Sequence, residues 1–398
     1  MDASVAIVGA GIGGLTLALS LQARGVPVTV YERADELREV GAAVALSANG
    51  LRPMDELGLL GELEAVATEP TELIHRRWRT NERVTAFPVG IDGSYRARFG
   101  APYLGIHRAE FQRVLSAACP PGMIRLGCEV VSATADGTLT LASGETVQAS
   151  VVVGADGVHS RLRSVVDPAA APVYTGTSGF RGIAPVSSLP SLPDPQAIQF
   201  WMGPDAHLLH YAIGAHGEDV NFLAVVEGPD EWTAGAGPAQ VAPNTLERAF
   251  ADWAPAVREM VTAVPQSAQW PLYTLPPLAR WSHERVVLLG DAVHTMLPHH
   301  GQGANQSIED AVVLADVLAE PGVLTGGHAE AFARYESLRR CRTRQVQRSS
   351  LVTSDLLHLP DGTDADARDA KLTGLDPWLA WIHGTDARAE TRPEALPA

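Results

Sequence analysis

Cysteine is scarce in this sequence: its 398 residues include only three, Cys119, Cys128 and Cys341. An odd number without paired spacing argues against a disulfide framework, and the spacing fits no metal-binding pattern. We therefore expect three reduced thiols with structural roles, because free cysteine commonly behaves as a small buried apolar residue.

Long apolar runs are also missing. No segment reaches the 18 or so uninterrupted apolar residues that a membrane helix needs, which argues against a membrane partner. The N-terminus enters an apolar strand almost at once, without the basic region and small-residue cleavage site of a secretory signal. These features predict a cytoplasmic protein.

Positive charge is in the minority, with 30 Lys and Arg against 46 Asp and Glu and a net charge of −16. We expect no nucleic-acid partner, since binding to a phosphate backbone needs clustered Lys and Arg. The basic run at 334–348 lies on a helical pattern beside Glu330 and Glu336. It predicts a solvated or interface face of a helix.

A glycine motif is present near the start. Gly9, Gly11 and Gly14 form G-x-G-x-x-G between an apolar strand at 4–8 and an amphipathic helix at 12–24. The first glycine allows a tight turn, the second lets a pyrophosphate approach the backbone, and the third lets helix and strand pack closely. The motif therefore predicts a dinucleotide site in a βαβ unit.

The second predicted strand, 28–32, ends at Glu32, whose carboxylate could accept hydrogen bonds from ribose hydroxyls. An NAD dehydrogenase would carry the same motif and the same acid. These residues alone therefore leave the identity of the nucleotide open.

A second signature follows the buried strand at 150–153. Gly154-Ala155-Asp156-Gly157 precedes Arg161 and Arg163, and a carboxylate at the end of a strand can face a ligand in the crevice. An ordinary Asx turn would have the same sequence.

The third signature is the most specific. Gly290-Asp291 ends a strand at 285–289, and Pro298 and the segment 301–305 then open a helix. Asp291 suits a ribityl hydroxyl, Pro298 stiffens the loop, and the amides of 301–305 supply partial positive charge where a reduced flavin is negative. Three separated signatures predict one long ligand held at several points, which favours FAD.

Three histidines, His294, His299 and His300, lie in this segment. Their spacing fits no standard ligand set and no catalytic carboxylate accompanies them, so we expect no metal site.

The pattern changes after about residue 172. Segments at 173–186, 196–203, 207–214 and 219–227 alternate apolar and polar residues, which predicts an antiparallel sheet. We predict an α/β fold with a discontinuous Rossmann-like domain and an inserted sheet. The expected parts are a first FAD-binding part at 1–172, a substrate-binding sheet at 173–270, a second FAD-binding part at 271–320, C-terminal helices at 321–387 and a tail at 388–398.

Over about 1–386, the chain resembles the class A, single-component FAD-dependent aromatic hydroxylases, similar to p-hydroxybenzoate, salicylate and 3-hydroxybenzoate 6-hydroxylases. Asp291 to Asn305 fits that family's Gly-Asp-x-x-His-x-x-x-Pro-x-x-Gly-x-Gly-x-Asn pattern at every fixed position. The resemblance implies a p-hydroxybenzoate hydroxylase-like fold, non-covalent FAD, NADH or NADPH as a transient co-substrate, and O2. The cofactor-binding residues that it implies are Gly9, Gly11, Ile12, Gly13, Gly14, Glu32, Arg33, Ala43, Val44, Arg108, Val130, Asp156, Asp291, Pro298, Gly301, Gln302, Gly303, Ala304 and Asn305.

The chain departs from the family pattern at two places. Ala43 stands where many relatives have glycine, in the loop near the flavin ring. His299 and His300 stand where relatives usually have apolar or aromatic residues, which predicts a more polar pocket.

The candidate catalytic residues are His207, Tyr211 and Pro298. The segment 203–211 resembles one in which relatives acting on hydroxylated aromatics carry a His and a Tyr four apart, and on a strand these two share a face. A histidine with a pKa near neutrality could take the proton of a phenol. The two residues could equally be amphipathic side chains half-buried in a sheet.

We therefore predict a monooxygenase that uses NAD(P)H and O2 to hydroxylate a phenolic or heteroaromatic small molecule through a flavin C4a-hydroperoxide, as a monomer or homodimer. The alternatives are an epoxidase or Baeyer–Villiger-type oxygenase acting on a complex metabolite, and a non-oxygenating flavin reductase. The Trp-x-Trp-x-x-Pro motif of flavin-dependent halogenases is absent from the sequence.

Overall fold

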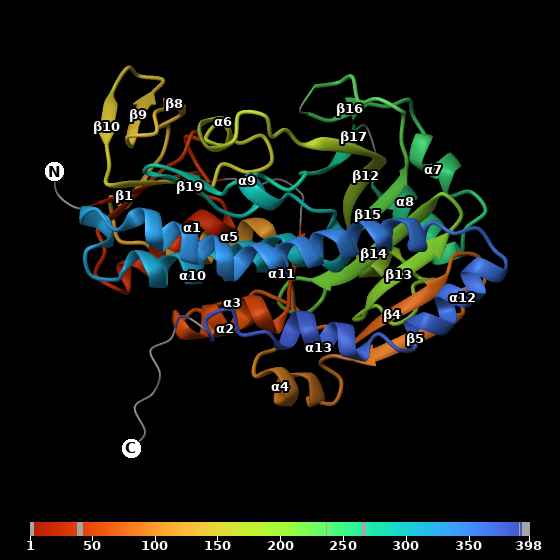
Figure 1. The fold of residues 1–398 in the computed structure, drawn as a ribbon. Helices are drawn as coiled ribbons and strands as arrows, with labels where there is room; N and C mark the ends of the chain where they lie inside the picture. The colour runs from red at the N-terminus through yellow and green to blue at the C-terminus, as the bar shows by residue number, and fades with distance from the viewer. Residues whose placement is uncertain (1–3, 38–42, 236, 265–267, 390, 392–398) are drawn as a thin grey trace.

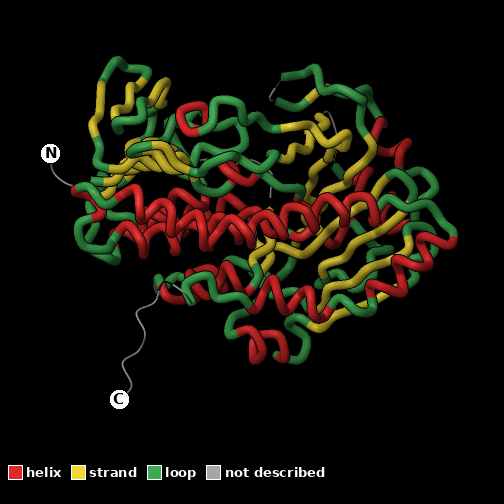
Figure 2. Tube along the Cα trace, viewed as in Figure 1, coloured by secondary structure: helices red, strands yellow, loops and turns green. Residues whose placement is uncertain are grey.

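The computed structural model describes residues 4–37, 43–235, 237–264, 268–389 and 391. Most of the predicted tail at 388–398 therefore lies outside the described residues. One sheet lies at the end that carries the N-terminus, a larger sheet lies at the other end, and long helices run between them (Figure 1; Figure 2 shows the same elements by type).

The first sheet has the strand order β18-β19-β11-β1-β2-β7. Its centre is β1 (Val5–Val8), which pairs in parallel with β2 (Val28–Tyr31) and with β11 (Val151–Gly154). β11 pairs in parallel with β19 (Val286–Leu288). Because the carboxyl ends of parallel strands meet at one edge of a sheet, this order brings the three predicted signatures together.

Helices cover this sheet. α1 (Ile12–Gln22) packs against α10 (Gln302–Leu318) and α5 (Arg108–Ala118), and α10 packs against α11 (His328–Leu357). Ten of the eleven residues of α1 are buried, so it is an interior helix rather than the amphipathic one that the sequence predicts. The remaining helices of the first half are α2 (Ala48–Glu56), α3 (Leu60–Glu64), α4 (Ser94–Phe99) and α6 (Arg163–Val166).

The segment 48–64 forms two helices, α2 and α3, where its pattern alone could suggest one. α2 ends at Glu56 with Leu57 as its C-cap, and Gly58 follows with a φ of +75°. A left-handed glycine directly after the C-cap ends a helix because its carbonyls are then satisfied locally.

The second sheet is larger than predicted. Its order is β16-β17-β12-β15-β14-β13-β4-β5. The strands β12 (Val173–Pro185), β13 (Ile198–Gly203), β14 (Ala206–Ile213) and β15 (Asp219–Glu227) lie within two residues of the predicted ranges and are antiparallel. β4 (Glu72–Arg77) and β5 (Arg83–Pro88), which precede residue 172, extend the sheet. β4 pairs in parallel with β13 and so covers a strand edge that would otherwise be exposed.

The two faces of this sheet have different neighbours. Trp201, Leu208 and Phe222 belong to an apolar cluster with α7 (Thr245–Ala249) and α8 (Pro255–Ala263). Leu209 and Tyr211, on the other face of β14, pack into the main core with the nucleotide-binding part. Alternate side chains of a strand point to the same face, so every second residue of β14 faces the nucleotide-binding part.

The other elements are short or peripheral. They are β3 (Ala43–Leu46), β6 (Leu104–His107), β7 (Ile124–Arg125), β8 (Val130–Ala133), β9 (Thr138–Leu141), β10 (Thr146–Gln148), β16 (Ala239–Gln240), β17 (Ala268–Thr274), β18 (Ser282–His283), α9 (Asp291–His294), α12 (Thr363–Leu372) and α13 (Asp376–Gly384), with 3-10 turns η1 (Val186–Ser188), η2 (Pro298–His300) and η3 (Val323–Thr325). Within the described parts of the chain, no helix has both the length and the apolar character that crossing a bilayer requires.

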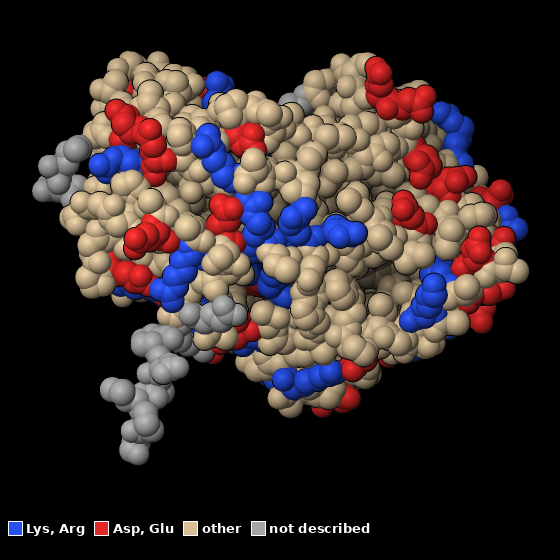
Figure 3. All heavy atoms as spheres, in the orientation of Figure 1, with Lys and Arg blue, Asp and Glu red and all other residues tan. Residues whose placement is uncertain are grey.

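The basic run on α11 is divided between two environments. Arg340, Arg344 and Arg348, spaced four apart, line an open surface groove, and Figure 3 shows basic side chains gathered over the middle of this face. Arg339 and Arg342 point inward and are buried. The expectation of a solvated face is therefore wrong for these two, because their positions on the helix face α10.

Candidate active site

A cavity of about 350 Å³ lies between the carboxyl edge of the first sheet and the second sheet. On one side it is lined by the glycine loop, by β3 and by the segment from Gly290 to Ser307. On the other side it is lined by residues of β12, β14, β15 and β17. The three signatures that are far apart in the chain therefore border one space together with the second sheet.

The structure brings most of the predicted site residues to this cavity. The lining includes Gly11, Ile12, Gly13, Gly14, Ala43, Val44, Arg108, Tyr211, Asp291, Pro298, Gly301, Gly303 and Ala304. The predicted residues that do not line it are Gly9, Glu32, Arg33, Val130, Asp156, His207, Gln302 and Asn305.

The glycine loop is packed so closely that side chains are excluded. Gly9 has a φ of +107°, and a Cβ atom on Gly14 would overlap the carbonyl oxygen of Gly9. A Cβ atom on Gly11 would meet nothing within 4 Å, and Gly11 lines the cavity. The loop thus presents bare backbone and the N-terminus of α1 to the cavity, as a pyrophosphate site requires.

Glu32 and Asp156 shape the edge of the sheet. The Oε2 atom of Glu32 accepts a hydrogen bond from the Ala10 amide at 2.8 Å. The Oδ2 atom of Asp156 accepts from the Arg161 amide at 2.8 Å, and its buried Oδ1 atom has no hydrogen-bond partner among the described residues. Both carboxylates fix backbone loops, and each keeps further capacity to accept a hydrogen bond.

Asp291 is the carboxylate of the predicted set that lines the cavity. It is the first residue of α9, and the side chain of Arg163 holds its backbone: Nη2 donates to the Asp291 carbonyl at 3.1 Å and Nε donates to the Ala292 carbonyl at 2.7 Å. No described residue donates a hydrogen bond to the Asp291 carboxylate, which leaves it available for a ligand hydroxyl.

The N-terminus of α10 faces the same cavity through Gly301, Gly303 and Ala304. Asn305 does not face it. Its Oδ1 accepts from the Ser47 amide at 3.1 Å, and its Nδ2 donates to the carbonyls of Ala45 and Gly301. Asn305 therefore holds the loop in shape instead of reaching a ligand directly.

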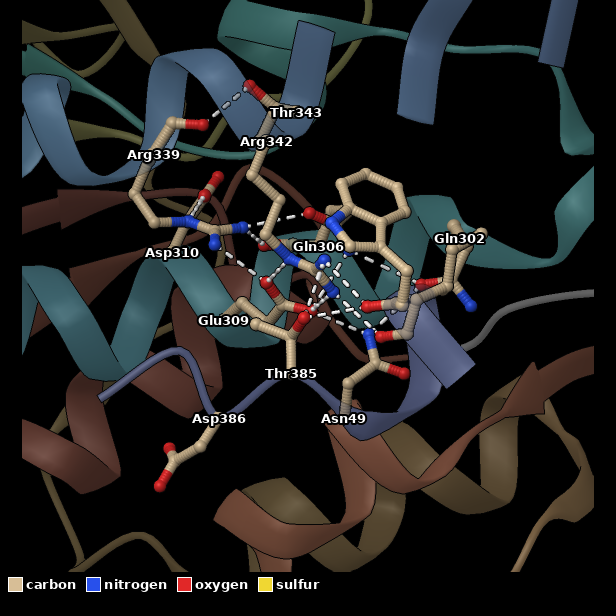
Figure 4. A network of polar contacts seen from close by, with 12 residues as sticks. Asn49, Gln302, Gln306, Glu309, Asp310, Arg339, Arg342, Thr343, Thr385 and Asp386 are labelled. Carbon is tan, nitrogen blue, oxygen red and sulfur yellow. Dashed lines mark hydrogen bonds and ion pairs between the residues drawn. The ribbon is translucent and has the colours of Figure 1, made fainter. Parts of the chain in front are cut away.

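A buried network of charges lies behind this loop (Figure 4). Glu309 accepts from Arg339 Nη1 at 2.6 Å, from Arg342 Nε at 2.6 Å and from Asn49 Nδ2 at 2.6 Å. Asp310 accepts from Arg339 Nε at 2.7 Å and from the Gly290 amide at 3.1 Å. The network joins α11, α10, α2 and the strand end before Asp291.

His294 also belongs to this network, through a 2.5 Å contact between its Nε2 and Asp310. Burial alone would raise the pKa of Asp310, but His294 and Arg339 outweigh it and the pKa falls to about 2. His294 therefore supports the loop. Among the described residues, no group of His, Cys, Asp and Glu has the arrangement of a metal site.

His207 and Tyr211 lie on one face of β14, but they differ in position. Tyr211 lines the cavity. His207 is fully buried, with its Nδ1 2.8 Å from His358 Nε2 and its ring 4.7 Å from that of His299. Burial, with His299 and His358 nearby, lowers the pKa of His207 well below its ordinary value. The expectation of a near-neutral pKa is therefore corrected.

Sequence reasoning missed several lining residues of the second sheet. Arg181 of β12, Asn221 of β15 and Tyr273 of β17 border the cavity but belong to no motif. Asn221 pairs directly with Tyr211 across the sheet. The alternation of strand β15 could have placed Asn221, but only the strand order shows that it neighbours Tyr211.

The cavity fits the parts of FAD. Backbone amides at the N-terminus of α1 suit the pyrophosphate, the Asp291 carboxylate suits a polyol, and the N-terminus of α10 suits the electron-rich edge of the ring system. A Cβ atom on Gly14 would overlap the carbonyl oxygen of Gly9 and so disrupt the tight turn that exposes the amides for the pyrophosphate.

Comparison with known proteins agrees with this fit. Residues 2–350 match the model of a family described as FAD binding domain. The chain is 39% identical over 389 residues to a 3-amino-4-hydroxybenzoate 2-monooxygenase of Streptomyces platensis, with 96% of each chain covered. It is 32% identical to a salicylate hydroxylase of Pseudomonas putida, with 96% of this chain and 93% of that protein covered.

A solved structure gives the same result for the fold. A salicylate hydroxylase substrate complex superposes with a TM-score of 0.81 at 30% identity, covering 99% of this chain and 98% of the other. The curated relatives are hydroxylases and monooxygenases, which supports the predicted activity over the epoxidase, Baeyer–Villiger and reductase alternatives. The chain therefore belongs to the FAD binding domain family and, within it, to the FAD-dependent aromatic monooxygenases.

Proposed function

We propose that this enzyme hydroxylates the ring of a small phenolic acid of the 3-amino-4-hydroxybenzoate type. The observation that carries the proposal is the cavity itself, in which the FAD-binding loops and a ring-binding sheet with Tyr211 border one space. The 39% identity to 3-amino-4-hydroxybenzoate 2-monooxygenases of Streptomyces, over nearly the whole of both chains, supports that substrate class. A hydroxylated pyridine carboxylate is the second candidate, because a 6-hydroxynicotinate 3-monooxygenase of Bordetella bronchiseptica is 33% identical.

FAD, when bound, would supply the redox chemistry, because it can accept electrons from NADH or NADPH and activate O2. The protein holds and orients it. In our proposal the amides of Gly11 to Gly14 bind the pyrophosphate, Glu32 and Asp156 support the loops around it, and Asp291 binds the ribityl chain. The amides of Gly301 and Gly303 place partial positive charge at the flavin ring.

The second sheet positions the substrate in this proposal. Tyr211 is buried at the cavity wall, and His207 and His299 lie on the same side of the sheet. The buried Nε2 atom of His207 and both ring nitrogens of His299 have no hydrogen-bond partner among the described residues. Neither His207 nor His299 lines the cavity, so in this proposal Tyr211 is the residue of this set that contacts the substrate.

A direct assay tests the proposed function. Purified enzyme with FAD and NADH or NADPH should consume O2 faster when 3-amino-4-hydroxybenzoate is added than without it. The amount of hydroxylated product should equal the amount of O2 consumed. Salicylate, 3-hydroxybenzoate and 6-hydroxynicotinate complete the panel. Peroxide as the only product with every compound would refute the proposal.

The role of Asp291 has its own test. Asp291→Ala should lower the fraction of FAD that survives gel filtration at least ~10-fold, because the lost carboxylate is a charge-assisted acceptor worth about 1.5–3 kcal/mol. Asp291→Asn keeps one acceptor oxygen, so its retained fraction of FAD should lie between those of the unchanged protein and Asp291→Ala. Flavin content equal to that of the unchanged protein would remove Asp291 from the site.

We also propose a cytoplasmic location and a monomeric or dimeric state, as the composition predicts. The proposed division places the cofactor-binding part at 1–172 and 271–320 and the substrate-binding sheet mainly at 173–270. The scarcity of cysteine supports the location, and the extra strands β4 and β5 widen the substrate-binding part.

A further inference from the structure

A second cavity, of about 180 Å³, lies between α4 and α13 beside the end of β5, and we call it the α4–α13 cavity. Among the described residues, none lines both this cavity and the active-site cavity. Its wall is largely aromatic. The centre of the Tyr95 ring lies 4.7 Å from that of Phe99 and 6.0 Å from that of Tyr103, with both rings edge-on to it. Because an apolar cavity of about 150 Å³ already holds benzene, one aromatic ring fits this space and finds ring edges to contact.

The helix α2 holds the walls of the α4–α13 cavity in place. The Nη1 atom of Arg52 donates to the Phe99 carbonyl at 2.6 Å and to the His383 carbonyl at 3.1 Å, so one guanidinium joins the end of α4 to the end of α13. Tyr95 is tied to the same helix, because its Oη atom accepts from the Ala48 amide at 3.2 Å. The cavity is therefore preformed, and an occupant loses less free energy to ordering than in a site that must first be assembled.

His383 lines the cavity and carries an N–H group without a partner. Its Nδ1 lies 3.0 Å from Tyr95 Oη, and burial raises the pKa of Tyr95, so the phenol keeps its proton. Burial, with His300, Arg342 and Arg52 nearby, lowers the pKa of His383 to about 3, so the imidazole is neutral. Since Nδ1 is the acceptor that the described residues offer to Tyr95, the proton of His383 is on Nε2. That group has no hydrogen-bond partner among the described residues, although His383 is only 4% exposed. Buried N–H groups without partners are rare, so this one indicates an occupant with an oxygen acceptor.

The cavity meets solvent at an ion pair. Arg98 and Asp376 both line it, their side chains are 47% and 56% exposed, and two hydrogen bonds of 2.5 and 3.1 Å join them. Exposed ion pairs contribute little to stability, so water can replace Arg98 at Asp376 when a ligand carboxylate binds the arginine. A planar guanidinium binds a carboxylate through two parallel N–H groups. Arg98 is the only arginine among the described lining residues, so it defines where a carboxylate would lie.

We propose that the α4–α13 cavity is a second binding site, which takes a small aromatic carboxylate. The ring lies against Tyr95 and Phe99, the carboxylate pairs with Arg98, and an oxygen of the occupant accepts from His383 Nε2. Benzoic acids have this chemistry. The inference goes beyond the proposed function, because the site lies outside the cavity that fits FAD and its occupancy needs no turnover.

The test uses benzoate with the FAD-loaded enzyme in the absence of NADH and NADPH. Equilibrium dialysis counts the bound benzoate, and crystals soaked in 4-bromobenzoate locate the bromine by its anomalous scattering. Leu379→Trp fills the cavity from α13, and Arg98→Gln removes the cation where the cavity meets solvent. Arg96→Gln is the matched control, because Arg96 is also on α4 and in an exposed ion pair but does not line the cavity.

We expect the parent enzyme to bind one benzoate more per chain than Leu379→Trp, and bromine to lie between α4 and α13. Arg98→Gln should weaken this extra site about 3-fold or more, and Arg96→Gln should leave it unchanged. Benzamide, which has no charge, should bind the parent and Arg98→Gln equally well. If Leu379→Trp does not fold, the comparison of Arg98→Gln with Arg96→Gln still decides the question.

Equal numbers of bound benzoate in the parent and in a folded Leu379→Trp would overturn the site. Bromine found in the active-site cavity alone would do the same. An equal loss of benzoate and benzamide binding in Arg98→Gln would show that the carboxylate is not recognised. If the parent hydroxylates no compound of the panel, the proposed function fails, but an extra benzoate that Leu379→Trp removes would still support this site.

Discussion

Acidification from pH 7.5 to 5.5 should remove most of the stability of this protein. Six of its histidines have lowered pKa values, with desolvation as the largest cause in each: His75, His207, His210, His299, His300 and His383. His300 is half-buried and the other five are buried. Their pKa values fall from 6.5 to about 4 for His300, to about 3 for His75, His210, His299 and His383, and well below 6.5 for His207.

The direction follows from proton binding. Below pH 6.5 the unfolded chain protonates these histidines, but the folded protein keeps them neutral at pH 5.5 because their pKa values are lowered well below 6.5. The unfolded state therefore binds more protons in this window, and stability falls as the pH falls. Each histidine costs roughly 1.4 kcal/mol per pH unit, so the six together cost about 8 kcal/mol by pH 5.5. Typical proteins have only about 5–15 kcal/mol in total.

Urea unfolding followed by circular dichroism at pH 7.5, 6.5 and 5.5 measures this effect, and we expect the midpoint to fall by more than half. His210→Phe supplies the control, since it removes one buried titrating group on the face away from the cavity. Its slope of stability against pH should be smaller by about 1.4 kcal/mol per unit. A midpoint that stays constant down to pH 5.5 would show that the buried histidines are not held neutral.

Glu309→Ala should be the most damaging single substitution in the loop support. Glu309 is completely buried and pairs with both Arg339 and Arg342, and Arg339 is itself only 1% exposed. Removing the carboxylate leaves two guanidinium groups with Asp310 as the remaining carboxylate of the network. Breaking a buried ion pair from one side typically costs 3–5 kcal/mol, so we expect a loss of about 4 kcal/mol in unfolding free energy.

The same substitution should weaken FAD binding, because Glu309 also holds Asn49, which donates a hydrogen bond to Gln302 at the start of α10. Urea titration and the FAD content after gel filtration measure the two effects. Glu110→Ala is a suitable comparison, since Glu110 forms an exposed ion pair with Arg113 and should change stability by less than about 1 kcal/mol. Equal stability of Glu309→Ala and Glu110→Ala would mean that the network contributes little.

Local features of the fold could be predicted from the sequence. The strand and helix around Gly9 to Gly14 follow from a short apolar run and glycine spacing, and most sheet strands follow from alternation. The split of the helix at 49–66 could also have been recognised from Gly58. The addition of β4 and β5 to the second sheet could not, because a short strand carries no mark of its partner.

The residues of the candidate site also fall into those that could be predicted from the sequence and those that could not. The glycine loop, Asp291 and the segment 301–305 could be predicted as candidate site residues because each belongs to a motif that spacing defines, and most of these residues line the cavity. The partner of His207 was not predicted, since His358 lies 151 residues away, at the C-cap of α11. Arg339 and Arg342 likewise could not be distinguished from their exposed neighbours.

The sequence by itself indicated the cofactor, because phosphate and polyol binding depend on local backbone that glycine and aspartate spacing encodes, and its resemblance to a known family indicated the class of enzyme. Only the tertiary structure decided which histidines and which arginines are buried and which residues of the second sheet border the cavity. Those properties depend on desolvation and on contacts between distant segments, and neither quantity exists until the chain has folded.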